Sequence, residues 1–152
     1  MTIFHGFNTS ASALTTQRLR MDVVSSNMAN AETTRARMVD GEWQPYRRKM
    51  VVTQPNEKSS FGHFLNQAKT SNNSGIGNGV KVSGIVEDRT PFKQVYNPDH
   101  PDANEQGYVH LPNVDPLREM VDLMSATRSY EANVTTLNAS KNMLLKALEI
   151  GR

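Results

Sequence analysis

The amino-acid sequence predicts an α+β protein in which two long terminal helices flank a small, irregular, β-rich middle segment. Two observations lead to this fold class. Apolar residues recur at every seventh position near both ends of the chain, and six of the seven prolines lie between those ends. A sevenfold apolar repeat is typical of helices that pair in a coiled coil, whereas prolines and short apolar runs indicate strands and turns. We therefore divide the chain into residues 1–34, 35–112 and 113–152.

The N-terminal segment predicts a helix over residues 3–31. Its apolar stripe consists of Phe7, Leu14, Met21, Val24 and Met28. Two polar residues, Asn27 and Asn30, lie near the end of the predicted helix. Polar residues beside a helical seam lower stability but can fix its register. We therefore include both asparagines in the expected assembly surface.

The middle segment predicts short strands that are separated by turns. The expected strands cover residues 48–53, 80–86, 94–96 and 108–111. Gly84 indicates a bulge or a close approach inside the second strand. Residues 61–68 predict one or two helical turns, and residues 71–79, rich in Ser, Asn and Gly, predict a flexible loop. We expect the strands to form one small sheet, too small to bury either terminal helix fully.

The C-terminal segment predicts a single helix from Pro116 to Ile150. Asp115 can accept hydrogen bonds from free N–H groups at its start, proline suits the first turn, and Gly151 follows its end. About 34 residues at ~1.5 Å each give a rod of roughly 50 Å. The expected assembly surface of this helix consists of Met120, Leu123, Tyr130, Val134, Leu137, Leu144 and Leu148.

Composition limits both the size of the core and the range of functions. Hydrophobic residues make up 37% of the 152-residue chain, and the net charge is only +2. A chain with so little apolar content can complete its burial against neighbouring molecules, and its near neutrality argues against a nucleic-acid partner. The absence of cysteine excludes disulfides and thiolate metal sites. No apolar run is long enough to span a membrane, and the N-terminus lacks the pattern of a cleavable signal peptide.

The sequence offers little evidence for catalysis, a metal or a cofactor. Asp99-His100-Pro101-Asp102 contains possible zinc ligands, but the other histidines lack the spacing of a metal site, and such clusters are ordinary turn formers. No serine lies in a nucleophile motif. Residues 75–79 are rich in glycine but lack the Gly-Lys-Ser/Thr ending of a phosphate-binding loop. We therefore expect no enzyme activity, no metal and no cofactor.

The basic triplet Arg47-Arg48-Lys49 has two interpretations. It could bind nucleic acid or anionic lipid, or it could be a solvated strand edge that discourages unwanted strand pairing. A lone triplet in a nearly neutral chain favours the solvated edge.

Three separated motifs resemble the bacterial flagellar rod and hook proteins. Residues 12–14 and 18–31 (Arg-Leu-Arg-Met-Asp-Val-Val-Ser-Ser-Asn-Met-Ala-Asn-Ala) resemble the N-terminal signature of this family. Residues 120–124, 128–133 and 146–151 resemble its C-terminus, and residues 97–114 resemble its proximal-rod branch. The resemblance covers almost the whole chain. Two positions depart from the common pattern, because Met28 replaces the usual isoleucine and Glu32 stands where many relatives have asparagine.

The resemblance implies a structural subunit of the flagellar basal body, located in the rod that crosses the periplasm or cell wall. Such proteins leave the cell interior through the flagellar export apparatus without a cleaved signal and polymerise into a hollow axial shaft. The implied partners are other rod proteins, copies of the same chain, and components of the basal-body rings and export apparatus. We expect the terminal helices to be largely unfolded before assembly and to form a coiled-coil layer in the shaft.

Three alternatives remain at this stage. The chain could be another axial protein of the same family. It could instead be a self-contained coiled-coil adaptor, in which the two terminal helices pair within one monomer. A peptidoglycan hydrolase is the third alternative, but it would require a separate domain with paired acids, for which the chain has no room.

Overall fold

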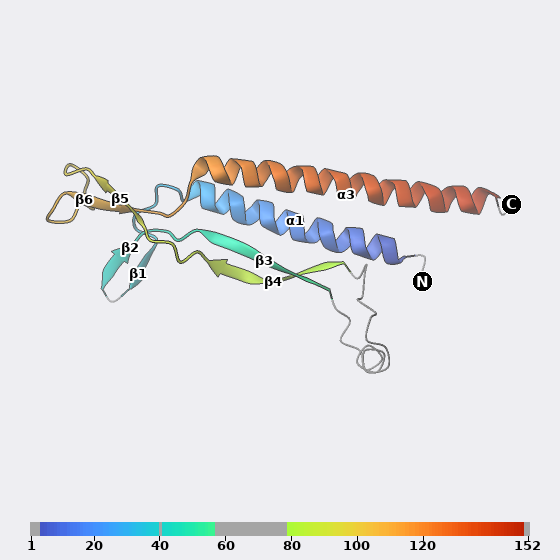
Figure 1. Ribbon diagram of the computed structural model, residues 1–152, viewed down its shortest axis with the longest axis horizontal. Helices are drawn as coiled ribbons and strands as arrows, with labels where there is room; N and C mark the ends of the chain where they lie inside the picture. The colour runs from blue at the N-terminus through green and yellow to red at the C-terminus, as the bar shows by residue number, and fades with distance from the viewer. Residues whose placement is uncertain (1–3, 40, 57–78, 151–152) are drawn as a thin grey trace, which may run out of the picture.

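The computed structural model describes residues 4–39, 41–56 and 79–150, and it has an elongated α+β architecture. Two long helices, α1 (His5–Ala29) and α3 (Pro116–Ile150), lie side by side and antiparallel, as Figure 1 shows. Antiparallel hairpins extend from them, and one of these hairpins covers the side of α1 that faces away from α3. The α+β class and the terminal position of both helices are therefore as predicted.

Helix α1 begins at His5, one residue after Phe4, and ends before Asn30, which donates hydrogen bonds to the free carbonyl groups at the end of the helix. The backbone N–H of Asn30 donates to the carbonyls of Ser26 and Asn27, and its side-chain Nδ2 donates to Ser26 O at 2.8 Å. Val23 and Val24, near this end, are buried. The buried hydroxyl of Thr16 donates to Ser12 O at 2.9 Å, so α1 can be covered on two sides without leaving this polar group unpaired.

Helix α3 has the bounds that the sequence predicted, and Asp115 Oδ1 accepts a hydrogen bond from Leu117 N at 3.0 Å at its start. Its side chains are buried or half-buried along one stripe, with alternating spacings of four and three residues. The stripe consists of Glu119, Leu123, Ala126, Tyr130, Asn133, Leu137, Ser140 and Leu144. Ala126 is fully buried. A small side chain at this position lets another helix approach closely, so the stripe is the face that α3 turns toward α1.

The strands form three separate two-stranded sheets, so the prediction of one small sheet was wrong. Strand β3 (Lys49–Pro55) pairs with β4 (Val80–Glu87), and β5 (Lys93–Tyr96) pairs with β6 (Tyr108–Leu111). These four strands lie close to the predicted ranges. The hairpin of β1 (Arg37–Val39) and β2 (Glu42–Gln44), whose strands are only three residues long, was not predicted.

The β3–β4 hairpin is attached to α1 at the end of the hairpin where β4 begins. Ser12 Oγ accepts a hydrogen bond from Val80 N at 3.1 Å, and Gly79 lies directly against Ser12 with a φ of +80°. Pairing shifts between Val52 and Thr53, where Gly84 lies opposite Val52, which confirms the predicted bulge. The predicted helical turns at 61–68 and all but the last residue of the predicted loop 71–79 lie outside the described residues.

Candidate functional site

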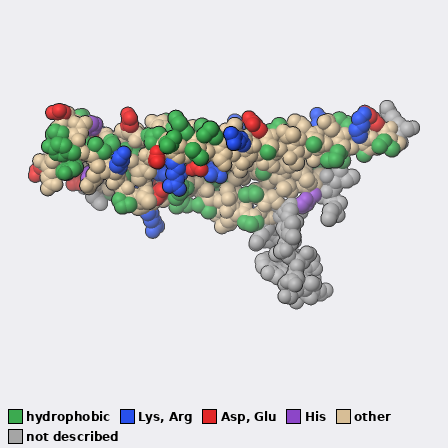
Figure 2. All heavy atoms as spheres, turned by 45° about the horizontal axis from the view of Figure 1, so that its top comes forward, with side chains coloured by type: hydrophobic (Ala, Val, Ile, Leu, Met, Phe, Trp, Pro, Cys, Tyr) green, Lys and Arg blue, Asp and Glu red, His purple; other side chains and the backbone are tan. Residues whose placement is uncertain are grey.

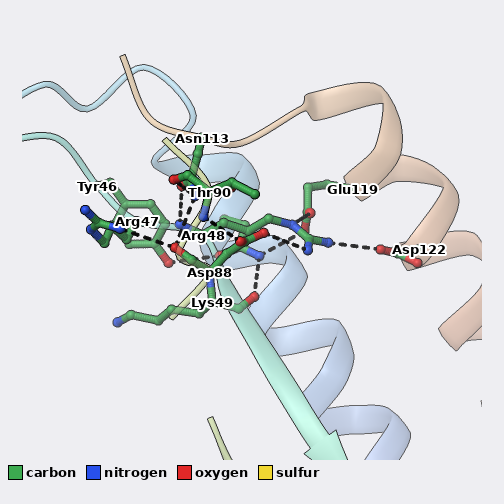
Figure 3. A network of polar contacts seen from close by, with 10 residues as sticks. Tyr46, Arg47, Arg48, Lys49, Asp88, Thr90, Asn113, Glu119 and Asp122 are labelled. Atoms are coloured by element: carbon green, nitrogen blue, oxygen red, sulfur yellow. Dashed lines mark hydrogen bonds and ion pairs between the residues drawn. The ribbon is translucent and has the colours of Figure 1, made fainter. Parts of the chain in front are cut away.

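A cluster of polar side chains lies where the end of α1, the start of β3 and the start of α3 meet. Figure 3 shows polar side chains from these elements converging, together with those of Asp88, Thr90 and Asn113. We call this cluster the polar junction; its members are Asn27, Tyr46, Arg48, Asp88, Thr90, Asn113, Glu119 and Asp122. Asn27 and Glu119 are fully buried, and Arg48 is 8% exposed. Polar groups this deeply buried are stable only when they are fully paired.

Asn27 uses all four hydrogen-bonding positions of its side-chain amide. Its Nδ2 donates to Lys49 O and to Glu119 Oε2, both at 2.9 Å. Its Oδ1 accepts from Lys49 N at 2.9 Å and from the Tyr46 hydroxyl at 3.0 Å. A primary amide has two donor hydrogens and two acceptor lone pairs, so no capacity is left over. Asn27 therefore links α1 both to the first residue of β3 and to α3.

Arg48 extends this network to three carboxylates. Its Nε donates to Glu119 Oε1 at 2.6 Å, and its Nη2 donates to Asp122 Oδ2 at 3.2 Å. Its Nη1 lies 3.8 Å from Asp88 Oδ2. Asp122 also accepts a hydrogen bond from Arg20 of α1 at 3.2 Å. The interpretation of Arg48 as part of a solvated strand edge was therefore wrong, because its guanidinium lies in a buried ion-pair network that joins β3 to α3.

The neighbours of Arg48 in the triplet are also engaged within the chain. The Arg47 guanidinium lies 4.5 Å from the centre of the Phe92 ring, and the Lys49 ammonium lies 5.6 Å from the centre of the Tyr46 ring. Both are cation–π distances. All three side chains of the basic triplet therefore make contacts within the chain.

Asn113 and Asp88 close the junction on the side of β4. Asn113 Oδ1 accepts from Arg48 N at 2.8 Å, while Asn113 Nδ2 donates to Thr90 Oγ1 at 2.9 Å. Asp88 Oδ1 accepts from Thr90 N at 3.0 Å. This backbone hydrogen bond lowers the pKa of Asp88 below its usual value; partial burial opposes the shift, and the Thr90 hydroxyl and the charge of Arg48 reinforce it.

The geometry of the polar junction is suited to holding α1, β3 and α3 in a fixed arrangement. Each buried charge faces an opposite charge, and the buried amide is saturated. A hollow of about 330 Å³ lies beside it, bordered by Arg20, Val24, Arg48, Glu119 and Asp122 among others. Four of the charged side chains that border this hollow, Arg20, Arg48, Glu119 and Asp122, already form ion pairs with one another.

The turn that contains the possible zinc ligands is attached to the segment after α1. Asp102 accepts hydrogen bonds from the Thr34 hydroxyl at 2.7 Å and from Arg35 Nε at 2.5 Å, and these bonds lower the pKa of Asp102. His100 Nδ1 accepts from Asp102 N at 3.1 Å. Within the described ranges, no three His, Asp or Glu side chains are grouped as metal ligands would be. Asp102 serves as an anchor for the turn.

The expected assembly residues are covered to different degrees. Of the fourteen, Val24 and Asn27 are buried, and Met120 and Leu148 are exposed. The half-buried ones are Phe7, Leu14, Met21, Met28, Asn30, Leu123, Tyr130, Val134, Leu137 and Leu144. Most of the predicted stripe of α3 thus faces α1 of the same chain.

A second apolar surface on α3, which faces away from α1, was not predicted. Leu117, Val121 and Met124 are 72%, 55% and 54% exposed. Their spacing of four and three residues was visible in the sequence. It was overlooked because the sevenfold row beside it is longer.

The pairing of Arg48 with Glu119 in the polar junction gave no comparable signal in the sequence, because no local pattern links residues that are 71 positions apart.

Comparison with known proteins agrees with the architecture at both ends of the chain. A family described as flagella basal body rod protein matches residues 7–37, which contain all but the first two residues of α1. A second family, flagellar basal body rod FlgEFG protein C-terminal, matches residues 105–150, which contain α3. The terminal helices and the segments next to them are therefore those of a flagellar basal-body rod protein, the class of protein that the sequence motifs resemble.

Individual relatives narrow this class. The chain is 64% identical to the flagellar basal-body rod protein FlgC of Bacillus subtilis (strain 168) over the full length of both proteins. It is 43% identical to FlgC of Borreliella burgdorferi, covering 99% of this chain and 98% of that protein, and 41% identical to FlgC of Salmonella typhimurium over both full lengths. The chain belongs to the FlgC family of flagellar basal-body rod proteins. It is a structural subunit of the rod, as its sequence predicted.

No helix among the described residues is long and apolar enough to cross a membrane.

Proposed function

We propose that the chain is exported unfolded, without a cleaved signal, and polymerises through its terminal helices into the proximal part of the hollow flagellar shaft. In this assembly α1 and α3 form the inner, coiled-coil layer, and the hairpins lie outside it. The partners are copies of the chain, other rod proteins, and components of the basal-body rings and export apparatus. The chain acts as a mechanical part and not as an enzyme.

The observation that carries the proposal is the uncovered apolar surface of α3. The helix pair covers one stripe of α3, yet large apolar side chains remain exposed on the rest of it. They are Leu117, Met120, Val121, Met124, Met143, Leu145, Leu148 and Ile150. Burying one such side chain fully contributes roughly 1.5–3 kcal/mol. A helix with this much apolar surface is most stable when neighbours surround it, as in a polymer.

The pairing of α1 with α3 changes the expectation for the single subunit. The alternative of a self-contained coiled-coil adaptor predicted that the two terminal helices pair within one monomer, and α1 and α3 do pair in this chain. The pairing accounts for α1, which lies between α3 and the β3–β4 hairpin, but it leaves the outer surface of α3 uncovered. Ordering each residue costs on the order of 1–2 kcal/mol of backbone entropy. We propose that contacts at the growing rod supply the remaining stabilisation, so that the helices become fully ordered there.

A charge placed on the outer surface of α3 tests the proposal. Val121→Asp puts a carboxylate into the exposed apolar surface, and Thr135→Asp puts the same charge at an exposed polar position of the same helix. Neither change enters the face that α3 turns toward α1, so both variants keep the wild-type circular-dichroism melting curve. We expect Val121→Asp to be missing from purified basal bodies and to abolish swimming, while Thr135→Asp is incorporated. Normal incorporation of both variants would refute polymerisation through this helix.

Hydrogen exchange tests the ordering of the helices. In dilute purified protein we expect faster exchange in residues 5–29 and 116–150 than in β3 and β4, and protection of both helices after incorporation into rods. Equal, concentration-independent protection of the helices in the free chain would instead describe a closed monomer that must open before it assembles.

A further inference from the structure

Basic side chains border two adjoining hollows near the β1–β2 and β3–β4 hairpins. The first hollow measures about 430 Å³ and the second about 480 Å³, and they share Arg37, Arg47 and Glu87. The basic side chains of the two hollows together form what we call the basic surface, which consists of Arg35, Arg37, Arg47, Lys49 and Arg89. On the face drawn in Figure 2, Lys and Arg side chains are likewise most numerous where the helices meet the hairpins.

The positive charge of the basic surface is not balanced within the described chain. Among the described residues, Glu87 is the one acidic side chain that borders either hollow, and it pairs with Arg37 at 3.7 Å. Arg35 pairs with Asp102, which lies outside the hollows. No described carboxylate is within ion-pair distance of Arg47, Lys49 or Arg89. Three cations of the basic surface are thus left without an anionic partner, in a chain whose net charge is only +2.

Two of these three cations are held in position by aromatic rings. The Arg47 guanidinium lies against the Phe92 ring and also donates a hydrogen bond to Asp88 O at 3.5 Å, and the Lys49 ammonium lies over the Tyr46 ring. An aromatic face attracts a cation through its quadrupole and leaves the positive charge in place. Arg47 and Lys49 are therefore oriented in advance and still able to pair with a carboxylate.

Exposed apolar side chains accompany these cations. Ile85 and Val86, which border the second hollow, are 50% and 47% exposed. In the β1–β2 hairpin, Met38 and Trp43 lie opposite each other and are 58% and 54% exposed. Arg, Trp and Met are enriched where proteins bind one another. A phosphate polymer could pair with the cations but would leave Ile85 and Val86 without apolar contacts, so the mixture favours a protein as the partner.

We propose that the basic surface binds an acidic segment of a different basal-body protein, one that carries apolar side chains among its Asp and Glu residues. This inference rests on the proposed function and names the chemistry of one partner. The carboxylates pair with Arg47, Lys49 and Arg89, while the apolar side chains of the segment cover Ile85 and Val86. The acidic residues of this chain are scattered along its sequence, so a second copy offers no run of them.

The place of the basic surface in the fold allows this contact to form in an assembled rod. The two hairpins lie on the side of α1 that faces away from α3, as Figure 1 shows. A partner bound there does not compete with neighbours that cover the outer surface of α3. The contact therefore adds to the proposed polymerisation without taking its place.

Photo-cross-linking in purified basal bodies tests the inference. A photo-cross-linking residue at position 85, inside the second hollow, should give an adduct that maps to an acidic segment of another basal-body protein. Lys49→Glu/Arg89→Glu reverses two exposed cations of the basic surface, and Lys81→Glu/Lys93→Glu makes the same change of charge at exposed positions outside it. We expect the first double variant to lower the adduct yield at least about tenfold and the control to leave it unchanged, because like charges repel across the contact. Replacing the acidic residues of the mapped segment by lysine should restore the yield in the first variant.

Four results would overturn this inference: no adduct from position 85, an adduct with a second copy of the chain or with a cell-wall polymer, equal yields from the two double variants, or no recovery after the charge swap. Each of them leaves the chain in the rod, so the proposed polymerisation would stand. Failure of the proposed function would instead appear as absence of the wild-type chain from purified basal bodies. If Lys49→Glu/Arg89→Glu does not enter basal bodies, Arg89→Gln and the control Lys81→Gln replace the two double variants. The yield should then fall at least about twofold for Arg89→Gln alone, and equal yields would again overturn the inference.

Discussion

Replacing Glu119 by alanine tests whether the polar junction holds the chain together. Glu119 is fully buried and accepts hydrogen bonds from Arg48 Nε at 2.6 Å and from Asn27 Nδ2 at 2.9 Å. Glu119→Ala leaves a guanidinium that is 8% exposed without its shortest contact, and it leaves one amide hydrogen without an acceptor. Arg48 keeps Asp122 at 3.2 Å and Asp88 at 3.8 Å, so its charge is still partly balanced.

The expected loss of stability follows from these contacts. Removing one partner of a buried ion pair usually costs 3–5 kcal/mol, because the other charge remains buried. The two remaining carboxylates place Glu119→Ala near the lower end, at about 3 kcal/mol. With a urea slope of about 2 kcal/mol per molar, the midpoint should fall by roughly 1.5 M. A loss of this size is a large part of the total stability of an ordinary domain.

The assay is urea unfolding of the purified full-length chain, followed by far-ultraviolet circular dichroism. Glu149→Ala is the matched control, because it removes a glutamate of the same helix whose partner, Lys146, is exposed. Such an exposed pair contributes about 0.5 kcal/mol or less. The double variant Arg48→Met/Glu119→Leu removes both buried charges, and we expect it to recover much of the loss.

Two results would refute the reasoning. If Glu119→Ala lowered stability no more than Glu149→Ala, the buried network would not be a significant source of stability. If the double variant were less stable than Glu119→Ala, the buried charge left on Arg48 could not be the cause of the loss.

Three further predictions concern the neighbourhood of this network. Asn27→Asp replaces two donors with a carboxylate oxygen that faces Glu119, so we expect the free energy of unfolding in urea to fall by at least about 3 kcal/mol at neutral pH. This loss should become smaller in acid, and a pH-independent loss would contradict the prediction. Gly79→Ala puts a Cβ against Ser12 Oγ at a φ of +80°, so thermal unfolding should show a loss of about 1–3 kcal/mol, whereas Gly84→Ala, with open space around it, should cost less. Asp88 and Asp102 have lowered pKa values, so the stability that they contribute is complete above the usual pKa of 3.8 and is lost as the pH falls through the lower pKa values of the folded state. Asp102→Asn should reduce this acid sensitivity, which is measured as the change in the urea midpoint from neutral pH to about pH 2.

The helices and most strands could be predicted because their signals are local. Asp115 and Pro116 mark the start of α3, and Gly84 marks the bulge in β4. The β1–β2 hairpin also had a local signal, the dipeptide Asp40-Gly41, a pair that favours tight hairpin turns. It was missed because strands of three residues are too short to show alternation.

The polar junction could not be predicted because its members are far apart in the sequence. Asn27 is 92 positions from Glu119, and no local pattern links them. Arg48 was misinterpreted because a basic triplet next to a strand is usually exposed, whereas here two carboxylates of the first turns of α3 face it. The family resemblance, by contrast, was recognisable because it depends on local motifs at the two ends, where the family matches also lie.

The position of the polar junction also has a mechanical consequence. It lies at one end of a helix of 35 residues, about 52 Å long. The β1–β2 and β5–β6 hairpins lie on its other side, while the β3–β4 hairpin runs back along α1 (Figure 1). A rotation of α3 by one degree about the polar junction moves the C-terminal end of the helix by about 0.9 Å, a shift comparable to the tolerance of packed side chains. The saturated amide of Asn27 and the paired charge of Arg48 therefore restrict rotation of α3 at the polar junction. In the proposed assembly, this restriction would set how accurately the far end of α3 meets neighbouring subunits.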